Sequence, residues 1–300
     1  MRRRSLIIFS FALISGPSHS HAWNVATKVS RRDWFRQVKN GGILVSTASF
    51  HPLSVNAVYK DPKTGILLPE EGEISTAIPG DWTAAENPLA GDEKSSLGRL
   101  DTTPDSVFYA DPRFVEHVDE NAVQLMTDYI STRAVKNGDT VLDLCSSWTS
   151  HLDTNRVTLK GITGLGMNEK ELAANPALTD WTVNDLNAMP TLPFEDASFS
   201  VVLCQLSIDY LTRPLEVLKE VGRVLKPGGR VHILFSNRLF IQKAVALWTG
   251  ADDIDHAYTV GCYLHFCGGG FRDIIAEDLS KRKGKRIAGD PLYVVSAIKA

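Results

Sequence analysis

The sequence predicts an α/β fold in which a doubly wound, mostly parallel sheet has helices on both faces. Short apolar runs alternate with amphipathic ones from residue 141 to the C-terminus, and parallel strands require such crossovers between them. The run Val141–Leu144 contains one acid and follows the turn-forming pair Asn137-Gly138, as expected for a buried strand that opens a β-α unit. Lys226-Pro227-Gly228-Gly229 ends a helical pattern and leads directly into another apolar run.

The individual elements follow in chain order. Asp119 can cap a helix that continues to about Arg133, because apolar residues recur on one face of this segment. Apolar runs predict strands at 141–144, 161–165, 180–183, 200–206, 230–235 and 292–298. Amphipathic segments predict helices at 169–174, 214–225, 240–248 and about 255–266. Residues 58–98 lack a sustained period, so we expect an irregular linker or cover before a main domain at 99–300.

Residues 1–57 indicate a removable targeting leader. Basic Arg2-Arg3-Arg4 precedes the apolar run Leu6–Ile14, and small residues flank His21, which is the layout of a secretory signal peptide. The next segment, Trp23–Asn40, is basic and acid-poor like a transit peptide, and Ser30-Arg31-Arg32-Asp33 resembles a twin-arginine export signal. This order resembles the targeting of plastid proteins in algae with complex plastids. We expect a plastid protein, in the stroma or the thylakoid lumen, with the secretory pathway as the alternative.

Charge and composition restrict the partners. The chain is 43% hydrophobic and 22% charged, which is typical of a globular protein. Eight of the 32 lysines and arginines but only one of the 35 acids lie in residues 1–57, so the remainder has a net charge of −10. Such a body is repelled by nucleic acids and by anionic membranes. The four cysteines lack the paired spacing of a metal site. We expect a small-molecule partner, no nucleic acid, no metal and no stable membrane insertion of the mature part, with the oligomeric state left open.

The stretch around the first strand combines a buried acid with small polar residues. Asp143 lies within the apolar run, and a buried carboxylate is costly unless it is hydrogen-bonded or charge-paired. It therefore meets loop amides or a ligand amine, or it ties down the following loop. That loop, Cys145 to His151, carries hydroxyl groups at the strand end where open α/β sheets bind ligands. It contains no glycine that would let a ligand approach the backbone closely.

A longer motif lies between residues 192 and 229. Its residues follow the pattern LPF…SF…EVxRVLKPGG. Together with the Val-Leu-Asp-Leu strand it resembles the class I S-adenosylmethionine-dependent methyltransferases, and most closely a type 11-like, uncharacterised group of plants, algae and bacteria with a modified first motif. The resemblance covers most of residues 99–300 and implies a Rossmann-like, seven-stranded sheet. The usual glycines of the first motif are replaced by Cys145, Ser147 and Thr149, and the usual ribose-binding acid by Gly166.

The resemblance also implies S-adenosyl-L-methionine as the cofactor. The residues it implies for cofactor binding are Asp143, Cys145, Ser146, Ser147, Asn168, Asp185, Leu186 and Gln205. Asn168 or Glu169 would replace the missing ribose acid, or would cap the next helix instead. Phe108, Tyr109, Arg113 and His117 either lie over the cofactor or pack against the domain's own edge. Candidate substrate residues are Tyr109, Asp209, Asn237 and Arg238, and candidate bases are His265, Tyr263 and His151.

Two functions of different classes remain open. The first is methyl transfer from S-adenosylmethionine to a small molecule, where aligning the nucleophile supplies much of the catalysis because the sulfonium already makes the methyl electrophilic. The second is a catalytically inactive binding or assembly module, since a fold does not secure its chemistry. An NAD-dependent oxidoreductase is disfavoured, because the Gly-x-Gly-x-x-Gly motif and the acid that follows it are absent.

Overall fold

The computed structural model describes residues 59–83, 85, 87–90 and 93–300, and the predicted leader lies outside them. Within these residues, seven strands form one sheet in the order β3-β2-β1-β4-β5-β9-β6. Neighbours from β3 to β5 are parallel, whereas β9 pairs antiparallel with both β5 and β6. This is the mostly parallel, Rossmann-like sheet that the sequence predicts. The strands are β1 Thr140–Leu144, β2 Gly161–Gly166, β3 Asp180–Val183, β4 Phe199–Gln205, β5 Leu225–Phe235, β6 Phe271–Asp278 and β9 Tyr293–Lys299, with a separate hairpin of β7 Arg282–Lys283 and β8 Arg286–Ile287.

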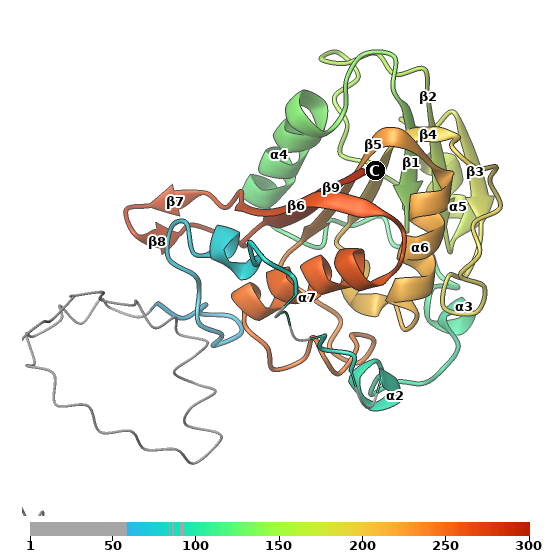
Figure 1. The fold of residues 1–300 in the computed structure, drawn as a ribbon. Helices are drawn as coiled ribbons and strands as arrows, with labels where there is room; N and C mark the ends of the chain where they lie inside the picture. The colour runs from blue at the N-terminus through green and yellow to red at the C-terminus, as the bar shows by residue number, and fades with distance from the viewer. Residues whose placement is uncertain (1–58, 84, 86, 91–92) are drawn as a thin grey trace, which may run out of the picture. The chain divides into compact units, whose positions relative to one another are not determined.

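Helices cover both faces of the sheet (Figure 1). Helix α4 (Glu120–Tyr129), continued by the π-helical turn η2 (Ile130–Ala134), packs on one face. Helices α6 (Pro214–Val224) and α7 (Asp253–Phe266) pack on the other. The shorter elements are η1 Ile74–Ala77, α2 Glu93–Ser96, α3 Asp105–Phe108, α5 Glu169–Ala174 and η3 Ile208–Tyr210. Side-chain N-caps from Asp119, Asn168 and Asp252 begin α4, α5 and α7, as the chemistry of these residues favours.

Strand β1 shows how the sequence pattern divides the core. Leu142 and Leu144 pack in the cluster that contains α6 and α7, whereas Val141 packs with residues of α4. Successive side chains of a strand point to opposite faces, so this alternation buries both faces of the sheet. Each of these three side chains is at most 1% exposed, and burial of a side chain of this size contributes about 1.5–3 kcal/mol.

The motif between residues 192 and 229 has a structural cause. Arg223 of α6 donates hydrogen bonds to the carbonyl oxygens of Leu192 (2.9 Å) and Phe194 (2.8 Å). The same guanidinium pairs with Glu220 at 2.6 Å and with Asp196 at 2.8 Å. One arginine therefore joins the loop before β4 to the helix that follows it.

Two predictions of secondary structure need correction. The helix expected at 240–248 is wrong, since this segment forms turns. Its amides at Ala246 and Leu247 donate to the carbonyls of Gly98 and Ser96, so contacts with the cover segment prevail over the local helical pattern. Strand β6 was not predicted. It lies at the sheet edge and carries exposed residues among its buried ones, which weakens the apolar signal.

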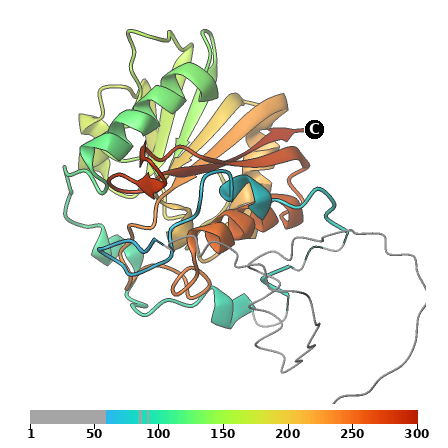
Figure 2. The same ribbon diagram turned by 90° about the vertical axis from the view of Figure 1, so that its left-hand side faces the viewer.

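Residues 59–98 contribute to the core despite their irregular backbone. Ile74, Leu89 and Leu97 are at most 6% exposed and belong to the same cluster as α6 and α7. Figure 2 shows the short turn η1 close to α7, which agrees with the contacts of η1 with α7 and β6. Among the described residues no helix has the length and apolar character needed to cross a bilayer.

Candidate functional site

A cavity of about 410 Å³ opens at the carboxyl ends of β1, β2 and β4. Here the strand order reverses between β1 and β4, which is the usual ligand-binding position in an open α/β sheet. The volume lies within the range of small-molecule sites, roughly 300–1,000 Å³. Trp148 stands in the wall, its indole nitrogen 3.4 Å from the carbonyl oxygen of Val115, and leaves the cavity open.

Asp143 holds the loop after β1. Its side chain is 1% exposed and accepts hydrogen bonds from Ser146 Oγ at 2.6 Å, Ser150 Oγ at 2.7 Å and Gln205 Nε2 at 2.9 Å. Burial raises the pKa of Asp143, while these three hydrogen bonds oppose that shift. Hydroxyl and amide donors thus shape a loop that contains no glycine.

Gln205 determines which nitrogen of His151 carries a proton. The amide nitrogen of Gln205 donates to Asp143 and, at 3.2 Å, to the carbonyl oxygen of Ser150, so its Oε1 faces His151 Nδ1 at 2.8 Å. An amide oxygen only accepts, and the hydrogen-bond network therefore assigns a proton to Nδ1. The other nitrogen, Nε2, lies 3.0 Å from Glu116 Oε2. Since an ionised carboxylate only accepts, the hydrogen bond at this nitrogen is donated by Nε2.

Glu116 supplies a negative charge at this nitrogen. Its hydrogen bond with His151 lowers the pKa of Glu116, so the carboxyl is ionised near neutral pH. The chain of contacts from Asp143 through Gln205 and His151 to Glu116 thus holds both edges of the imidazole ring in place.

Three cavity-lining residues have a strained, left-handed backbone conformation. Cys145, His151 and Leu206 have φ values of 57°, 47° and 48° and line the cavity. Non-glycine residues rarely adopt this left-handed region, which costs on the order of 1–3 kcal/mol each. At His151 the conformation accompanies the placement of the ring between Gln205 and Glu116, and strain of this kind is typical of functional sites.

The end of β2 presents a different acid from the one expected. A Cβ on Gly166 would lie 2.1 Å from the carbonyl oxygen of Ser146, so no side chain fits at this position. Asn168 lines the cavity, but its Oδ1 caps α5 and its Nδ2 donates to the carbonyl of Tyr109. Glu171 of α5 lines the cavity and accepts hydrogen bonds from Ser147 Oγ and from the amide of Arg113, both at 2.6 Å.

Asp185 and Leu186 line the cavity after β3. Oδ1 of Asp185 accepts from the amides of Asn187 at 2.9 Å and Ala188 at 3.2 Å, which makes a turn stabilised by a side chain. The carboxylate thus has the turn-stabilising role and also stands at the cavity wall. The apolar Leu186 beside it is 4% exposed.

The segment at 105–118 forms the facing wall. Tyr109, Arg113 and His117 line the cavity, and Phe108 packs beneath the Arg113 guanidinium at 4.4 Å. Phe240, after β5, also lines the cavity and lies 5.6 Å from the same guanidinium. The segment therefore lies over the cavity, which was one of its two expected positions.

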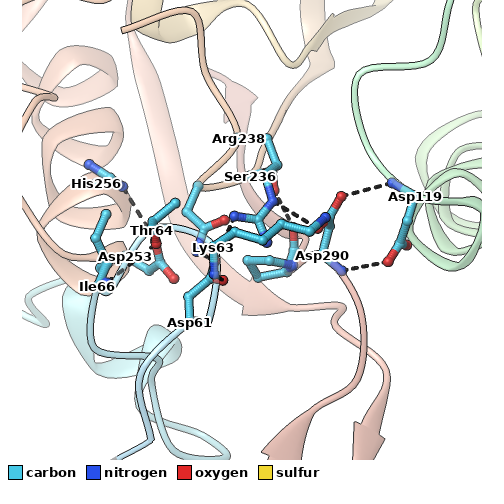
Figure 3. A network of polar contacts seen from close by, with 12 residues as sticks. Asp61, Lys63, Thr64, Ile66, Asp119, Ser236, Arg238, Asp253, His256 and Asp290 are labelled. Atoms are coloured by element: carbon cyan, nitrogen blue, oxygen red, sulfur yellow. Dashed lines mark hydrogen bonds and ion pairs between the residues drawn. The ribbon is translucent and has the colours of Figure 1, made fainter.

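Arg238 belongs to a polar network with Asp61 and Asp290 (Figure 3). Arg238 lines the cavity, but its guanidinium pairs with Asp61 and Asp290, both at 2.7 Å. Asn237 is 1% exposed, donates to Asp61 at 2.8 Å and does not line the cavity. Asp290 also exchanges hydrogen bonds with Asp119, the cap of α4. The network joins the cover to the sheet, and Asn237, a candidate substrate residue, is bonded within it and not exposed to the cavity.

Three further candidate residues lie outside the cavity lining. Tyr263 is 1% exposed within the core, and His265 stacks on Trp82 at 4.4 Å, so neither reaches the cavity. Asp209, in η3, is 4% exposed and also lies outside the cavity lining. Helix α7 is buried along most of its length, and its sequence therefore carries no clear signal of which face meets the sheet.

Glu116, Glu171 and Phe240 were missed by the sequence analysis. Glu116 and Glu171 are single acids in a loop and on a helix, where an acid is usually solvated. Phe240 lies in the segment predicted to be helical. The one available signal was the density of aromatic and charged residues at 105–118. Among the described residues, no group of three or more histidine, cysteine or acidic side chains could hold a metal ion.

Comparison with known sequences gives a consistent result. A family profile described as a methyltransferase domain matches residues 147–233. UbiE of Roseobacter denitrificans, a ubiquinone/menaquinone biosynthesis C-methyltransferase, is 39% identical over 87 residues, or 28% of this chain and 34% of that protein. The chloroplastic 2-phytyl-1,4-beta-naphthoquinone methyltransferase of Arabidopsis thaliana is 32% identical over 123 residues, or 36% and 46% of the two chains. The chain thus spans less than half the length of these relatives.

Solved structures overlap over a larger part of the chain. A SAM-dependent methyltransferase from Thermotoga maritima covers 60% of this chain and 90% of its own, with 14% identity and a TM-score of 0.44. One from Mesorhizobium loti covers 60% and 99%, with 16% identity and a TM-score of 0.42. The strand order described above, rather than these overlaps, identifies the fold.

Proposed function

Because this chain belongs to the class I S-adenosylmethionine-dependent methyltransferase superfamily, we propose that it transfers a methyl group from that cofactor to a small molecule. In this proposal His151 takes the proton that the acceptor loses. The observation that carries it is the position of His151 between Gln205 and Glu116 at the wall of the cavity. An imidazole that is held in position at a ligand-sized cavity is suited to general-base catalysis.

The side chains around the cavity fit an adenosyl sulfonium. The carboxylates of Asp185 and Glu171 and the apolar Leu165 and Leu186 line it. A carboxylate accepts from an adenine amino group or a ribose hydroxyl, and apolar side chains pack against the purine. Trp148 and the other cavity-lining rings suit a sulfonium, because cations are attracted to aromatic faces. Loss of the glycines has not closed the cavity.

The cofactor-binding roles follow from these positions. Asp185 and Leu186 would hold the adenine and Glu171 the ribose, in place of the acid that cannot fit at Gly166. Asp143, Ser146 and Gln205 would act by shaping the loop, since their hydrogen bonds are made to one another. The cofactor supplies an electrophilic methyl group, and what the chain adds is position and proton transfer.

His151 would act on the acceptor. With its Nδ1 proton donated to Gln205, its Nε2 accepts a proton from a hydroxyl or an acidic carbon of the acceptor. Glu116 then receives the new N–H as a hydrogen bond and stabilises the imidazolium. Positioned general bases contribute about 10²- to 10⁴-fold to the rate.

The acceptor would be a planar, hydroxylated ring. Tyr109, Tyr210 and Phe240 line the cavity, and aromatic walls favour stacked or edge-to-face ring contacts. The relatives named above are quinone methyltransferases, and a quinol has both a ring of this kind and an acidic proton. We extend that class of acceptor to this chain.

The test compares His151→Asn with His265→Asn. Both remove an imidazole, but His265 stacks on Trp82 away from the cavity. With a reduced naphthoquinone as the probe acceptor, we expect kcat to fall about 100-fold or more in the first variant and to stay unchanged in the second. Binding of S-adenosylhomocysteine should be equal in both. A His151→Asn variant with wild-type kcat would refute the role of the base.

One observation favours the inactive alternative. The hydroxyls of Ser146 and Ser150 are bonded to Asp143, and that of Ser147 to Glu171, so the loop is satisfied by the protein itself. Calorimetry separates the two functions. Failure to bind S-adenosylmethionine and S-adenosylhomocysteine at millimolar concentration would leave a binding or assembly module.

For the location, we retain the plastid. The support is the leader pattern in residues 1–57 and the chloroplastic relative of Arabidopsis thaliana. A fusion of residues 1–57 to a fluorescent protein, expressed in an alga with a complex plastid, should accumulate in the plastid. Fluorescence confined to the secretory pathway would support the alternative instead.

A further inference from the structure

The geometry points to a carboxylate-binding subsite at Arg113, which receives an anionic group of a molecule bound in the cavity. This inference rests on the proposed function, because it names a group on one of the two ligands of that site. The source of the carboxylate is either the methionine end of the cofactor or the acceptor. Both would present the same planar pair of oxygens to the guanidinium.

The positive charges of the cavity wall differ in whether they have an acidic partner. Among the described residues, the guanidinium of Arg238 pairs with Asp61 and Asp290, and the imidazole of His151 pairs with Glu116. Arg113 also lines the cavity, yet no carboxylate of the described residues lies within ion-pair distance of its guanidinium. It is therefore the cavity-lining arginine whose charge has no acidic partner in this part of the chain.

Most N–H donors of the Arg113 guanidinium are not used by the part of the protein that the structure describes. Within the described residues, the guanidinium donates one hydrogen bond, from an Nη to the carbonyl oxygen of Phe108 at 2.9 Å. Arginine has five N–H donors, so most of them remain for a ligand. The nearby Glu171 is held by the backbone amide of Arg113, not by its side chain, and accepts from Ser147 as well.

Aromatic rings surround the Arg113 guanidinium and hold it in position. The Arg113 guanidinium lies 4.4 Å from the ring of Phe108 and 5.6 Å from the rings of Tyr109 and Phe240. Rings around a guanidinium contact its face and leave the in-plane N–H groups for a carboxylate. A carboxylate accepts two parallel bonds from this fork, which lysine cannot supply. The rings thus prepare the bidentate geometry before a ligand arrives.

The net charge of the protein opposes the binding of an anionic ligand. Residues 58–300 carry a net charge of −10, and a field of this sign repels an anionic ligand. A ligand with a carboxylate therefore needs a local cation to bind. Arg113 supplies that cation in the cavity wall, over the ring of Phe108.

The test measures binding, not turnover. Calorimetry on the full mature protein compares S-adenosylmethionine with its decarboxylated form, and, with S-adenosylhomocysteine present, benzoate with the neutral benzamide. The variants are Arg113→Met, which removes the charge, and Arg113→Lys, which keeps the charge without the fork. Arg156→Met is the matched control, because Arg156 is exposed and pairs with Asp128 away from the cavity.

We expect the wild type to bind one carboxylated probe about 10- to 100-fold more tightly than its neutral counterpart, the range of a charged bidentate contact. Arg113→Met should abolish that preference, Arg113→Lys should retain part of it, and Arg156→Met should leave it unchanged. Loss of the preference for S-adenosylmethionine identifies the cofactor's carboxylate, and loss of that for benzoate identifies the acceptor's.

Two results would overturn the subsite: a wild type without either preference, or an Arg113→Met variant that retains it while both proteins are folded by circular dichroism. The proposed function fails in a different way. In that case S-adenosylmethionine and its decarboxylated form both fail to bind, whereas a subsite would still show a preference for benzoate over benzamide when the cofactor product is omitted.

Discussion

Asp209 makes the stability of the protein depend on pH in a direction unusual for an acid. Its side chain is 4% exposed, and its Oδ2 has no hydrogen-bond partner among the described residues. Burial raises the pKa of Asp209 from 3.8 to about 7. The folded protein therefore binds a proton that the unfolded chain has released at the same pH. Stability should fall as pH rises between these two values and stay constant above them.

The size of the effect follows from the shift. One pKa unit corresponds to about 1.4 kcal/mol. The free energy of unfolding should therefore fall by about 3 kcal/mol between pH 5 and the pKa of about 7, and change little from there to pH 8. His232 acts in the opposite direction. Burial lowers the pKa of His232 from 6.5 to about 3, so its contribution is present above 6.5 and is lost as pH falls towards 3. The wild-type profile therefore mixes two opposing slopes.

The variant Asp209→Asn isolates the first slope, because His232 is present in both proteins. Urea unfolding followed by tryptophan fluorescence would give the free energy of unfolding of each protein at pH 5 and at pH 8. We expect the variant to gain stability relative to the wild type by about 3 kcal/mol over this interval. A relative change below about 0.5 kcal/mol would refute the assignment of a neutral buried carboxyl.

Three further substitutions test the site and the fold. Gly166→Ala should weaken cofactor binding and cost about 1–3 kcal/mol of unfolding free energy, since its Cβ would lie 2.1 Å from a backbone oxygen. Thermal unfolding measures the loss, and Gly80→Ala, whose Cβ would meet no atom within 4 Å, is the control. Gln205→Leu should remove the preference for the Nδ1 proton of His151, and ¹⁵N NMR that still shows the wild-type protonation state would contradict this role. Arg223→Met should lower the free energy of unfolding by about 2 kcal/mol or more, through loss of charged hydrogen bonds to two carbonyls; unchanged urea unfolding would exclude a structural role for this motif residue.

The position of the site could be predicted from the sequence, whereas the contacts between its side chains could not. The end of β1 and the loop after it were predicted as a ligand site, and the cavity lies there. Asp143, Gln205 and His151 were all candidates, but as separate cofactor and base residues. Their association depends on distance in space, since His151 and Gln205 are 54 residues apart and His151 and Glu116 are 35 apart. No local period carries that information.

The candidate residues that lie outside the cavity lining share a physical feature. Tyr263 and His265 follow β5 in the chain, yet α7, which carries them, packs on the sheet away from the cavity. Asn237 and Asp209 are polar residues beside strand ends, and both are buried. The side chains of Asn237 and His265 contact segments that are distant in sequence. The contact of Asn237 with Asp61, for example, spans 176 residues.

By itself the sequence determined the order of the strands and helices from β1 to β5, the capping of α4 and the edge of the sheet that carries the cavity. These properties arise from backbone preferences and from the alternation of apolar and polar residues, which act over a few residues at a time. The tertiary structure alone decided which charges pair and which remain open to a ligand. Arg238 and Arg113 look alike in the sequence, and only the first is placed beside Asp61 and Asp290. An ion pair depends on distances of a few ångströms, and those are set by the packing of segments far apart in the chain.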